Sequence, residues 1–102
     1  MYYVLTNKFS FEIAENDLPE KMLLRDAINV DSEIGDRWRL PTNEELLLMF
    51  RLHQKAIGKF KHENYWCSTW IKNTVSFRSG ENFTHPGQRP DPQCWVRLVR
   101  NI

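Results

Sequence analysis

Apolar side chains follow two different periods along the chain, and the changes between them separate its predicted elements. Residues 8–13 alternate apolar and polar side chains, which is the period of two expected of a strand with one buried face. Residues 2–5 are apolar and rich in β-prone types, and a polar Thr-Asn pair separates the two runs. The pattern therefore predicts a strand or hairpin within residues 1–16.

The following stretch, residues 17–58, carries the start signals of two helices. Asp17 stands three residues before Glu20, with a proline near the first helical position. Both features are typical of a helix N-terminus. We therefore predict a first helix that begins at Asp17 and ends between residues 31 and 35.

The second helix has the stronger start signal. Thr42 can accept a hydrogen bond from the backbone N–H of Glu45, whose carboxylate can reach back to the backbone of Thr42, the arrangement known as a capping box. Apolar residues then repeat at helical spacing from Leu46. Their face is wide enough to be buried against both a sheet and the first helix. Gly58 is predicted to end this second helix.

The pattern changes to strands in the remaining residues 59–102. Three stretches there are aromatic, β-branched or alternating, and we predict a strand in each. They are residues 65–70, 74–77 and 94–99. Residues 79–93 contain two glycines and three prolines, which predicts one long irregular loop. Long loops in compact domains are often functional.

Length and composition limit the classes of protein that the chain can be. With 102 residues, 41% of them apolar, and four tryptophans, residues 1–102 fit one domain that can order itself without disulfides or a metal ion. The net charge of +1 removes the simplest electrostatic reason to expect nucleic acid or an anionic membrane as a partner.

The N-terminus lacks the basic and apolar leader of an exported protein. No apolar run reaches the ~20 residues that a membrane span needs. We therefore expect a cytoplasmic protein. In that compartment Cys67 and Cys94 are expected to be two reduced thiols.

Three short motifs stand in order along the chain. They are WRLPTNEEL at residues 38–46, YWCST at residues 65–69 and VRLVR at residues 96–100. Together they resemble a bacterial family, the domain of unknown function first described at the C-terminus of collagen-like adhesins, whose members pair W-R-L-P-T-x-x-E-L with Y-W-S-S-T and V-R-x-V-R. The resemblance covers residues 20–102, and Cys67 stands where the family usually has a serine.

That family is similar to the C-type lectin-like fold. The resemblance therefore implies an α+β domain in which two helices pack on a small, twisted, mostly antiparallel sheet, with the chain termini in neighbouring strands. It also implies that either Trp66 or Trp70 is a core residue, and we assign that role to Trp66. Related folds include carbohydrate-binding lectins, formylglycine-generating enzymes and receptor-binding proteins of phages, so the fold alone does not define a function.

The arginines around Trp38 have two interpretations. In an extended segment Arg37 and Arg39 face together and can hold an anion. We favour the alternative, in which Arg39 pairs internally with Glu44, Glu45 or a C-terminal strand residue, because charges beside a large buried aromatic need partners.

The arginines of the third motif, Arg97 and Arg100, fall on opposite faces of a strand, so at most one of them is expected to be buried. Together with the helix cap and the tryptophans, they complete a set of predicted structural residues. That set is Trp38, Arg39, Thr42, Glu45, Trp66 and Arg97.

Aromatic side chains near the long loop are the candidate binding residues. Trp70 lies close to a predicted turn and Trp95 follows the loop, so either indole can serve as a platform for a sugar ring or a peptide. The loop adds further aromatic and polar side chains. The predicted binding residues are Trp70, Phe83, His85, Arg89 and Trp95.

No metal site, cofactor or catalytic set is predicted. Zinc motifs supply ligands in close pairs, whereas His53, His62 and His85 have no short paired spacing and the two cysteines are isolated. Nothing in the sequence places a base beside Cys67, and cysteine is commonly buried as a small apolar side chain. We therefore do not expect an enzyme.

Two hypotheses for the function follow from these expectations. The first is a non-enzymatic, metal-independent binding module with a C-type lectin-like fold, which recognises a protein or carbohydrate partner through residues 79–93 and the adjacent aromatics. The alternative is an intracellular structural or regulatory subunit, a homo-oligomer whose exposed aromatics form the subunit interface.

Overall fold

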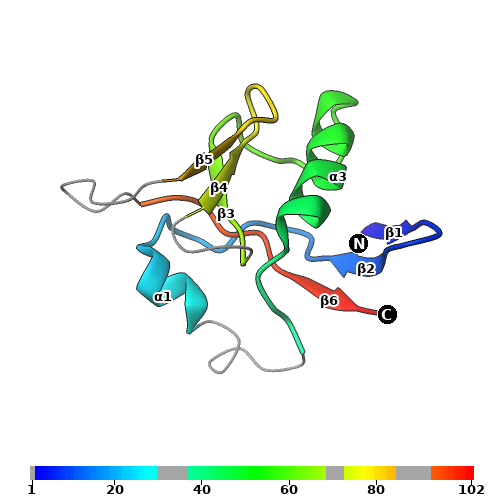
Figure 1. The fold of residues 1–102 in the computed structure, drawn as a ribbon, viewed down its shortest axis with the longest axis horizontal. Helices are drawn as coiled ribbons and strands as arrows, with labels where there is room; N and C mark the ends of the chain where they lie inside the picture. The colour runs from blue at the N-terminus through cyan, green and yellow to red at the C-terminus, as the bar shows by residue number, and fades with distance from the viewer. Residues whose placement is uncertain (1, 30–36, 69–72, 85–92) are drawn as a thin grey trace.

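The computed structural model describes residues 2–29, 37–68, 73–84 and 93–102. These residues form a small α+β domain with two helices and two three-stranded antiparallel sheets (Figure 1). In chain order the elements are β1 (Tyr2–Leu5), β2 (Ser10–Ile13), α1 (Leu24–Ile28), α3 (Asn43–Gln54), β3 (Asn64–Trp66), β4 (Asn73–Ser76), β5 (Asn82–Thr84) and β6 (Val99–Asn101). No helix within the described ranges has the length and apolar character needed to cross a membrane.

The first sheet brings the two ends of the chain together. Its strand order is β1-β2-β6, and β2 pairs with β6 in an antiparallel register that places Ile13 opposite Val99. Phe11 and Ile13 are fully buried, so they face the core as predicted. Glu12 is buried as well, because Arg100 lies opposite and donates its Nε–H to Oε1 of Glu12 at 2.7 Å. The predicted N-terminal hairpin is confirmed.

The second sheet has the strand order β3-β4-β5. Because β5 lies inside residues 79–93, the prediction of one irregular loop is wrong at residues 82–84. Gly80 has a φ of 79°, and its N–H donates to the carbonyl oxygen of Ser76 at 2.8 Å, so the chain turns back along β4. The glycine therefore marks a hairpin turn. Residues 85–92 of the predicted loop lie outside the described residues.

The first helix is shorter than predicted. α1 begins after Leu23, and no side chain caps it, so the prediction that Asp17 caps a helix is wrong. The physical reason is a competing set of backbone hydrogen bonds between residues 14–22 and residues 94–98. The N–H groups of Ala14, Leu18 and Met22 donate to the carbonyl oxygens of Leu98, Val96 and Cys94 at 3.0, 2.9 and 3.0 Å.

The predicted strand at residues 94–99 is also wrong in most of its length, since only Val99 belongs to β6. The preceding residues form isolated bridges, in which Cys94 pairs with Met22 and Trp95 pairs with Tyr65. Cys94 thus pairs with the segment before α1, whereas Trp95 pairs with β3. Because the partner changes between these two residues, neither pairing extends into a continuous strand.

The second helix begins as predicted. The backbone N–H of Glu45 donates to Oγ1 of Thr42 at 3.2 Å, and the N–H of Thr42 donates to Oε1 of Glu45 at 2.8 Å, which confirms the capping box. Arg39 holds the same carboxylate through two hydrogen bonds of 2.7 and 2.8 Å and also donates to Oδ1 of Asn101 at 2.6 Å. The internal pairing predicted for Arg39 is therefore confirmed.

These contacts also set the ionisation of Glu45. Burial by itself raises the pKa of the Glu45 carboxyl, but the hydrogen bonds from Arg39 and Thr42 outweigh it, and the net pKa lies below its ordinary value. Glu45 is therefore a charged carboxylate, and in this form it joins the start of α3 to Arg39 in the preceding segment.

The second helix ends at Gln54, so the prediction that Gly58 stops it is wrong. Ala56 takes the left-handed conformation with a φ of 58°, and the N–H of Ile57 donates to the carbonyl oxygen of Leu52 at 3.0 Å. This is the hydrogen bond of a Schellman motif, in which glycine usually holds the left-handed position. Gly58 is used for a different contact, described below.

The arginines flanking Trp38 do not form a shared anion site. Arg37 has a φ of 65° and is exposed, so the segment is not extended there and the prediction that Arg37 and Arg39 face together is wrong. Trp38 is half-buried, and the guanidinium of Arg100 lies 4.4 Å from the centroid of its ring. The indole thus packs between the second core cluster and a cation of the first sheet.

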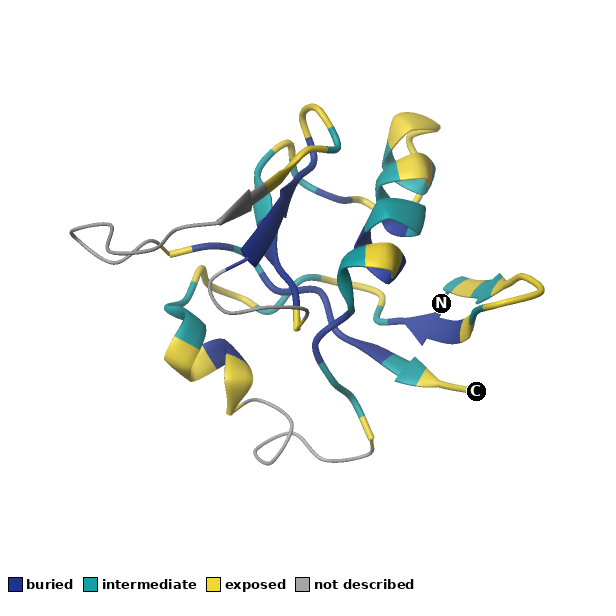
Figure 2. Cartoon of the chain, viewed as in Figure 1, coloured by how far each residue is buried: buried dark blue, intermediate teal, exposed yellow. Residues whose placement is uncertain are grey.

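Two apolar clusters make up the core, and Figure 2 shows which parts of the chain are buried. In the first cluster, Leu46 and Met49 of α3 pack with residues of both sheets, including Ile13 and Tyr65, and with Cys67. In the second, Trp66 packs with α1 and the C-terminal segment. The side chains of residues 65–67 thus alternate between the two clusters, which confirms the predicted core position of Trp66.

We expect the Thr42→Ala variant to lose about 1 kcal/mol of unfolding free energy, because the backbone N–H of Glu45 loses its side-chain acceptor. Urea denaturation followed by circular dichroism measures this loss. The control is Thr42→Ser, which keeps the hydroxyl and is expected to stay close to the original stability. Equal losses in the two variants would mean that the cap does not stabilise the helix.

Candidate functional site

Trp95 is the predicted binding residue whose side chain the structure describes, and its backbone is held by β3. Its N–H donates to the carbonyl oxygen of Asn64 and its carbonyl accepts from the N–H of Trp66, both at 3.0 Å. The indole is half-buried. One part of the ring is therefore fixed in the fold while another part is open to solvent.

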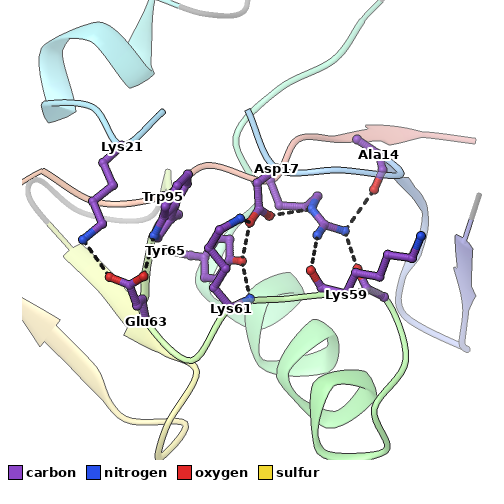
Figure 3. A network of polar contacts seen from close by, with 10 residues as sticks. Ala14, Asp17, Lys21, Lys59, Lys61, Glu63, Tyr65 and Trp95 are labelled. Atoms are coloured by element: carbon purple, nitrogen blue, oxygen red, sulfur yellow. Dashed lines mark hydrogen bonds and ion pairs between the residues drawn. The ribbon is translucent and has the colours of Figure 1, made fainter. Parts of the chain in front are cut away.

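Three charged side chains from two segments of the chain surround the indole of Trp95 (Figure 3). The Nζ atoms of Lys61 and Lys21 lie 4.0 and 5.9 Å from the ring centroid. The indole N–H donates to Oε2 of Glu63 at 3.0 Å, and Lys21 pairs with Oε1 of the same carboxylate at 2.7 Å. We call Trp95, Lys21, Lys61 and Glu63 the Trp95 surface.

The hydrogen bonds of the Trp95 surface also favour the charged form of its acid. Donation from Lys21, followed by donation from the indole of Trp95, lowers the pKa of the Glu63 carboxyl below its ordinary value. Near neutral pH the surface therefore presents an aromatic ring, two cationic donors and one anionic acceptor. These groups can bind hydroxyl, amide or carboxylate groups beside an apolar ring face.

Beneath this surface lies a buried polar network centred on Asp17. The Nε–H of Arg97 donates to Oδ1 of Asp17 at 2.7 Å, while Lys61 and the hydroxyl of Tyr65 donate to Oδ2 at 2.7 and 2.8 Å. The side chains of Asp17 and Arg97 are 3% and 1% exposed. Burial, with the neighbouring carboxylate of Asp17, raises the pKa of the Tyr65 hydroxyl, so it stays a donor.

The remaining donors of Arg97 meet backbone carbonyls. Nη1 donates to the oxygens of Gly58 and Ala14 at 2.9 and 3.2 Å, Nη2 donates to that of Lys59 at 3.2 Å, and the guanidinium carbon lies 4.3 Å from the ring centroid of Phe60. Gly58 has a φ of 98°, and a Cβ at this position would lie 2.4 Å from the Phe60 ring. This close approach explains why glycine is needed there.

Of the two arginines in the third motif, only Arg97 is buried, as predicted, because Arg100 lies at the partly exposed face of the first sheet. The buried partner Asp17 was missed, since its position before Glu20 looks like a helix cap. Lys61 and Glu63 were missed as well, because they lie between predicted elements and the sequence does not indicate which residues contact such charged side chains.

The other predicted binding residues are not placed at this site by the structure. Trp70, His85 and Arg89 lie outside the described residues. Phe83 lies in β5, where the backbone pairs with β4 opposite Thr74.

The two cysteines are free and buried, which agrees with the expected reduced thiols. Burial raises the pKa of the Cys94 thiol to about 11, so its reactive thiolate is scarce at neutral pH. Cys67 directs its thiol to the backbone oxygen of Asn73, at 3.4 Å from Sγ. Among the described residues, no group of three His, Cys, Asp or Glu side chains is arranged to hold a metal ion.

Comparison with known proteins does not assign the chain to a family. No protein-family model matches it, and no curated protein matches it. The resemblance of the three motifs is therefore a hypothesis that rests on the motifs themselves.

We expect Asp17→Asn to lower the unfolding free energy by about 3–5 kcal/mol, because it leaves the buried guanidinium of Arg97 without a counter-charge. Urea denaturation measures the change. The matched control is Asp26→Asn on the exposed side of α1, for which we expect a change within about 0.5 kcal/mol. A loss at Asp17 no larger than that of the control would show that the ion pair adds no stability.

Proposed function

We propose that the protein is a non-enzymatic binding module with a C-type lectin-like fold, which recognises a glycan or protein partner without a metal ion. The binding surface consists of residues 79–93 together with adjacent aromatics. The observation that carries this proposal is the Trp95 surface, where a partly open indole directly follows residues 79–93 and is bordered by two cationic donors and an anionic acceptor.

The chemistry of the Trp95 surface suits a sugar ring or an extended peptide. Both ligands combine an apolar face, which can stack on an indole, with polar groups at the edge, which need donors and acceptors in fixed positions. Lys61 lies over the ring, and an exposed cation–π contact is worth only about 0.5–1 kcal/mol. The ammonium group stays paired with Asp17, so a ligand is expected to stack on the part of the ring that Lys61 leaves open.

The site is also prepared for binding before a ligand arrives. The backbone of Trp95 is paired with β3, and Lys61 is anchored by the buried carboxylate of Asp17 at 2.7 Å. A ligand that meets side chains already held in place loses less conformational entropy on binding.

Two features support the lectin-like part of the proposal. The three sequence motifs resemble those of a family with that fold. In the first sheet, β2 from the N-terminal hairpin and the C-terminal β6 are hydrogen-bonded neighbours (Figure 1), which is the placement of the chain ends that the resemblance implies.

The test is to screen the protein on an array of immobilised glycans and on an array of extended peptides, and then to compare variants on the ligands that it binds. We expect Trp95→Ala, and the triple variant of Phe83, His85 and Arg89 to alanine, to weaken binding by about tenfold or more. The control Arg51→Ala changes an exposed cation of α3 and is expected to bind like the original protein.

Circular dichroism and thermal melting of each variant separate lost binding from lost folding. Folded variants that bind as tightly as the original protein would exclude the Trp95 surface and residues 79–93 as the binding site. Absence of binding to every glycan and peptide on the arrays would contradict the binding-module proposal itself.

A second candidate function is that of an oligomeric subunit, and β1 favours it. This strand lies at the edge of the first sheet, carries no charged residue, and exposes Tyr3 by 57% and Leu5 by 71%. Uncharged edge strands can pair with another chain, and an antiparallel pair of identical strands fits a two-fold symmetric dimer. The partner in this case is a second copy of the chain.

Size-exclusion chromatography with light scattering tests this second candidate. A dimer formed through β1 is expected to dissociate in the Leu5→Lys variant, because it places a charged side chain on the edge strand, and to persist in the control Arg25→Ala on α1. A monomer over the whole concentration range would exclude the oligomeric subunit.

A further inference from the structure

His53 and His62 lie in direct contact although eight residues separate them in the sequence. His53 is in the last turn of α3, and His62 lies in the segment that leads into β3. Nε2 of His53 and Nδ1 of His62 are 2.7 Å apart, and the ring centroids are 4.7 Å apart with the planes at 79°. The sequence gives no sign of this pair, because their spacing matches no metal motif.

The ring of His53 is held by its neighbours, whereas His62 is held through its backbone. The ring of His53 packs beside Phe60 and Phe77, with centroids 6.2 and 5.6 Å away. The backbone carbonyl of His62 accepts a hydrogen bond from Nε of Arg78 at 2.7 Å. The hydrogen bond between the two nitrogens therefore joins two different parts of the fold and keeps both rings within reach of one metal ion.

The two rings share one hydrogen bond, in which one nitrogen donates and the other accepts. A neutral imidazole has a free electron pair on one nitrogen, which is the form that binds a metal ion.

We propose that His53 and His62 form a two-histidine site for a divalent transition-metal ion of the Cu²⁺ or Ni²⁺ type, held at the junction between α3 and the segment before β3. Metal binding breaks the hydrogen bond between the two rings, and the ion lies to one side of the line between the nitrogens, because 2.7 Å is too short for two metal–nitrogen bonds in line. The ring that donated the hydrogen bond changes its tautomer, since it loses the proton from the shared nitrogen and gains one from solvent on its other nitrogen. Both imidazoles therefore bind as neutral ligands, and no net proton is released.

The separation of the nitrogens selects among metal ions. With a metal–nitrogen distance of about 2.0–2.1 Å, two ligands at a right angle lie about 2.9 Å apart and two tetrahedral ligands about 3.3 Å apart. From the hydrogen-bonded separation of 2.7 Å, the nitrogens need to move apart less for the right-angle geometry of Cu²⁺ and Ni²⁺ than for a tetrahedral ion. Because the described residues contain no group of three ligand side chains, we expect water to complete the coordination.

Calorimetric titration of the intact protein with CuCl₂, and separately with NiCl₂ and ZnCl₂, tests the proposal at about pH 7.5. We expect one Cu²⁺ per chain, with Zn²⁺ bound more weakly. Weaker binding is expected at about pH 5.5, since a protonated imidazole has no free electron pair. His53→Gln and His62→Gln are each expected to weaken Cu²⁺ binding about tenfold or more, whereas His85→Gln, which changes the remaining histidine, is expected to bind as before.

Nuclear magnetic resonance of the unmodified protein provides a readout that does not depend on folded variants. Substoichiometric Cu²⁺ is expected to broaden the ring signals of His53 and His62 before those of His85. The proposal is overturned by absence of Cu²⁺ binding, by binding that survives in both the His53 and His62 variants, or by broadening that begins at His85.

Discussion

The buried ion pair between Asp17 and Arg97 is the contact on which the rest of the structure depends. Removing a guanidinium from water costs several kcal/mol unless its donors and its charge are satisfied. Here one carboxylate and three backbone carbonyls satisfy them. Those carbonyls belong to Ala14, Gly58 and Lys59, so one cation fixes the chain after the first hairpin, the turn after α3 and the C-terminal segment together.

The same pair links the core to the surface. Asp17 accepts from Arg97 on one oxygen and from Lys61 and Tyr65 on the other, and Lys61 also lies over the ring of Trp95. The position of a surface lysine is therefore set by a carboxylate that is almost completely buried. This arrangement connects the stability of the fold with the shape of the Trp95 surface, since both use the same acceptor.

The sequence predicted the parts of the structure that depend on near neighbours. The cap formed by Thr42 and Glu45 and the inward faces of Phe11 and Ile13 follow from spacing alone, whereas the α+β class was implied by the resemblance of the three motifs. Asp17 was assigned wrongly because a helix cap and a buried ion pair use the same residue type. Its true partner is 80 residues away, and no local pattern records a contact of that kind.

The pairing of β2 with β6 has a consequence for how the chain folds as it is made. Phe11 and Ile13 leave the ribosome early, but the strand that completes their sheet and the guanidinium that neutralises Asp17 arrive only when residues 97–101 are synthesised. Until then, the apolar hairpin lacks the strand that completes its sheet, and Asp17 has only Lys61 and Tyr65 as partners. Completion of this sheet therefore waits for contacts of long sequence separation, which are slow to form.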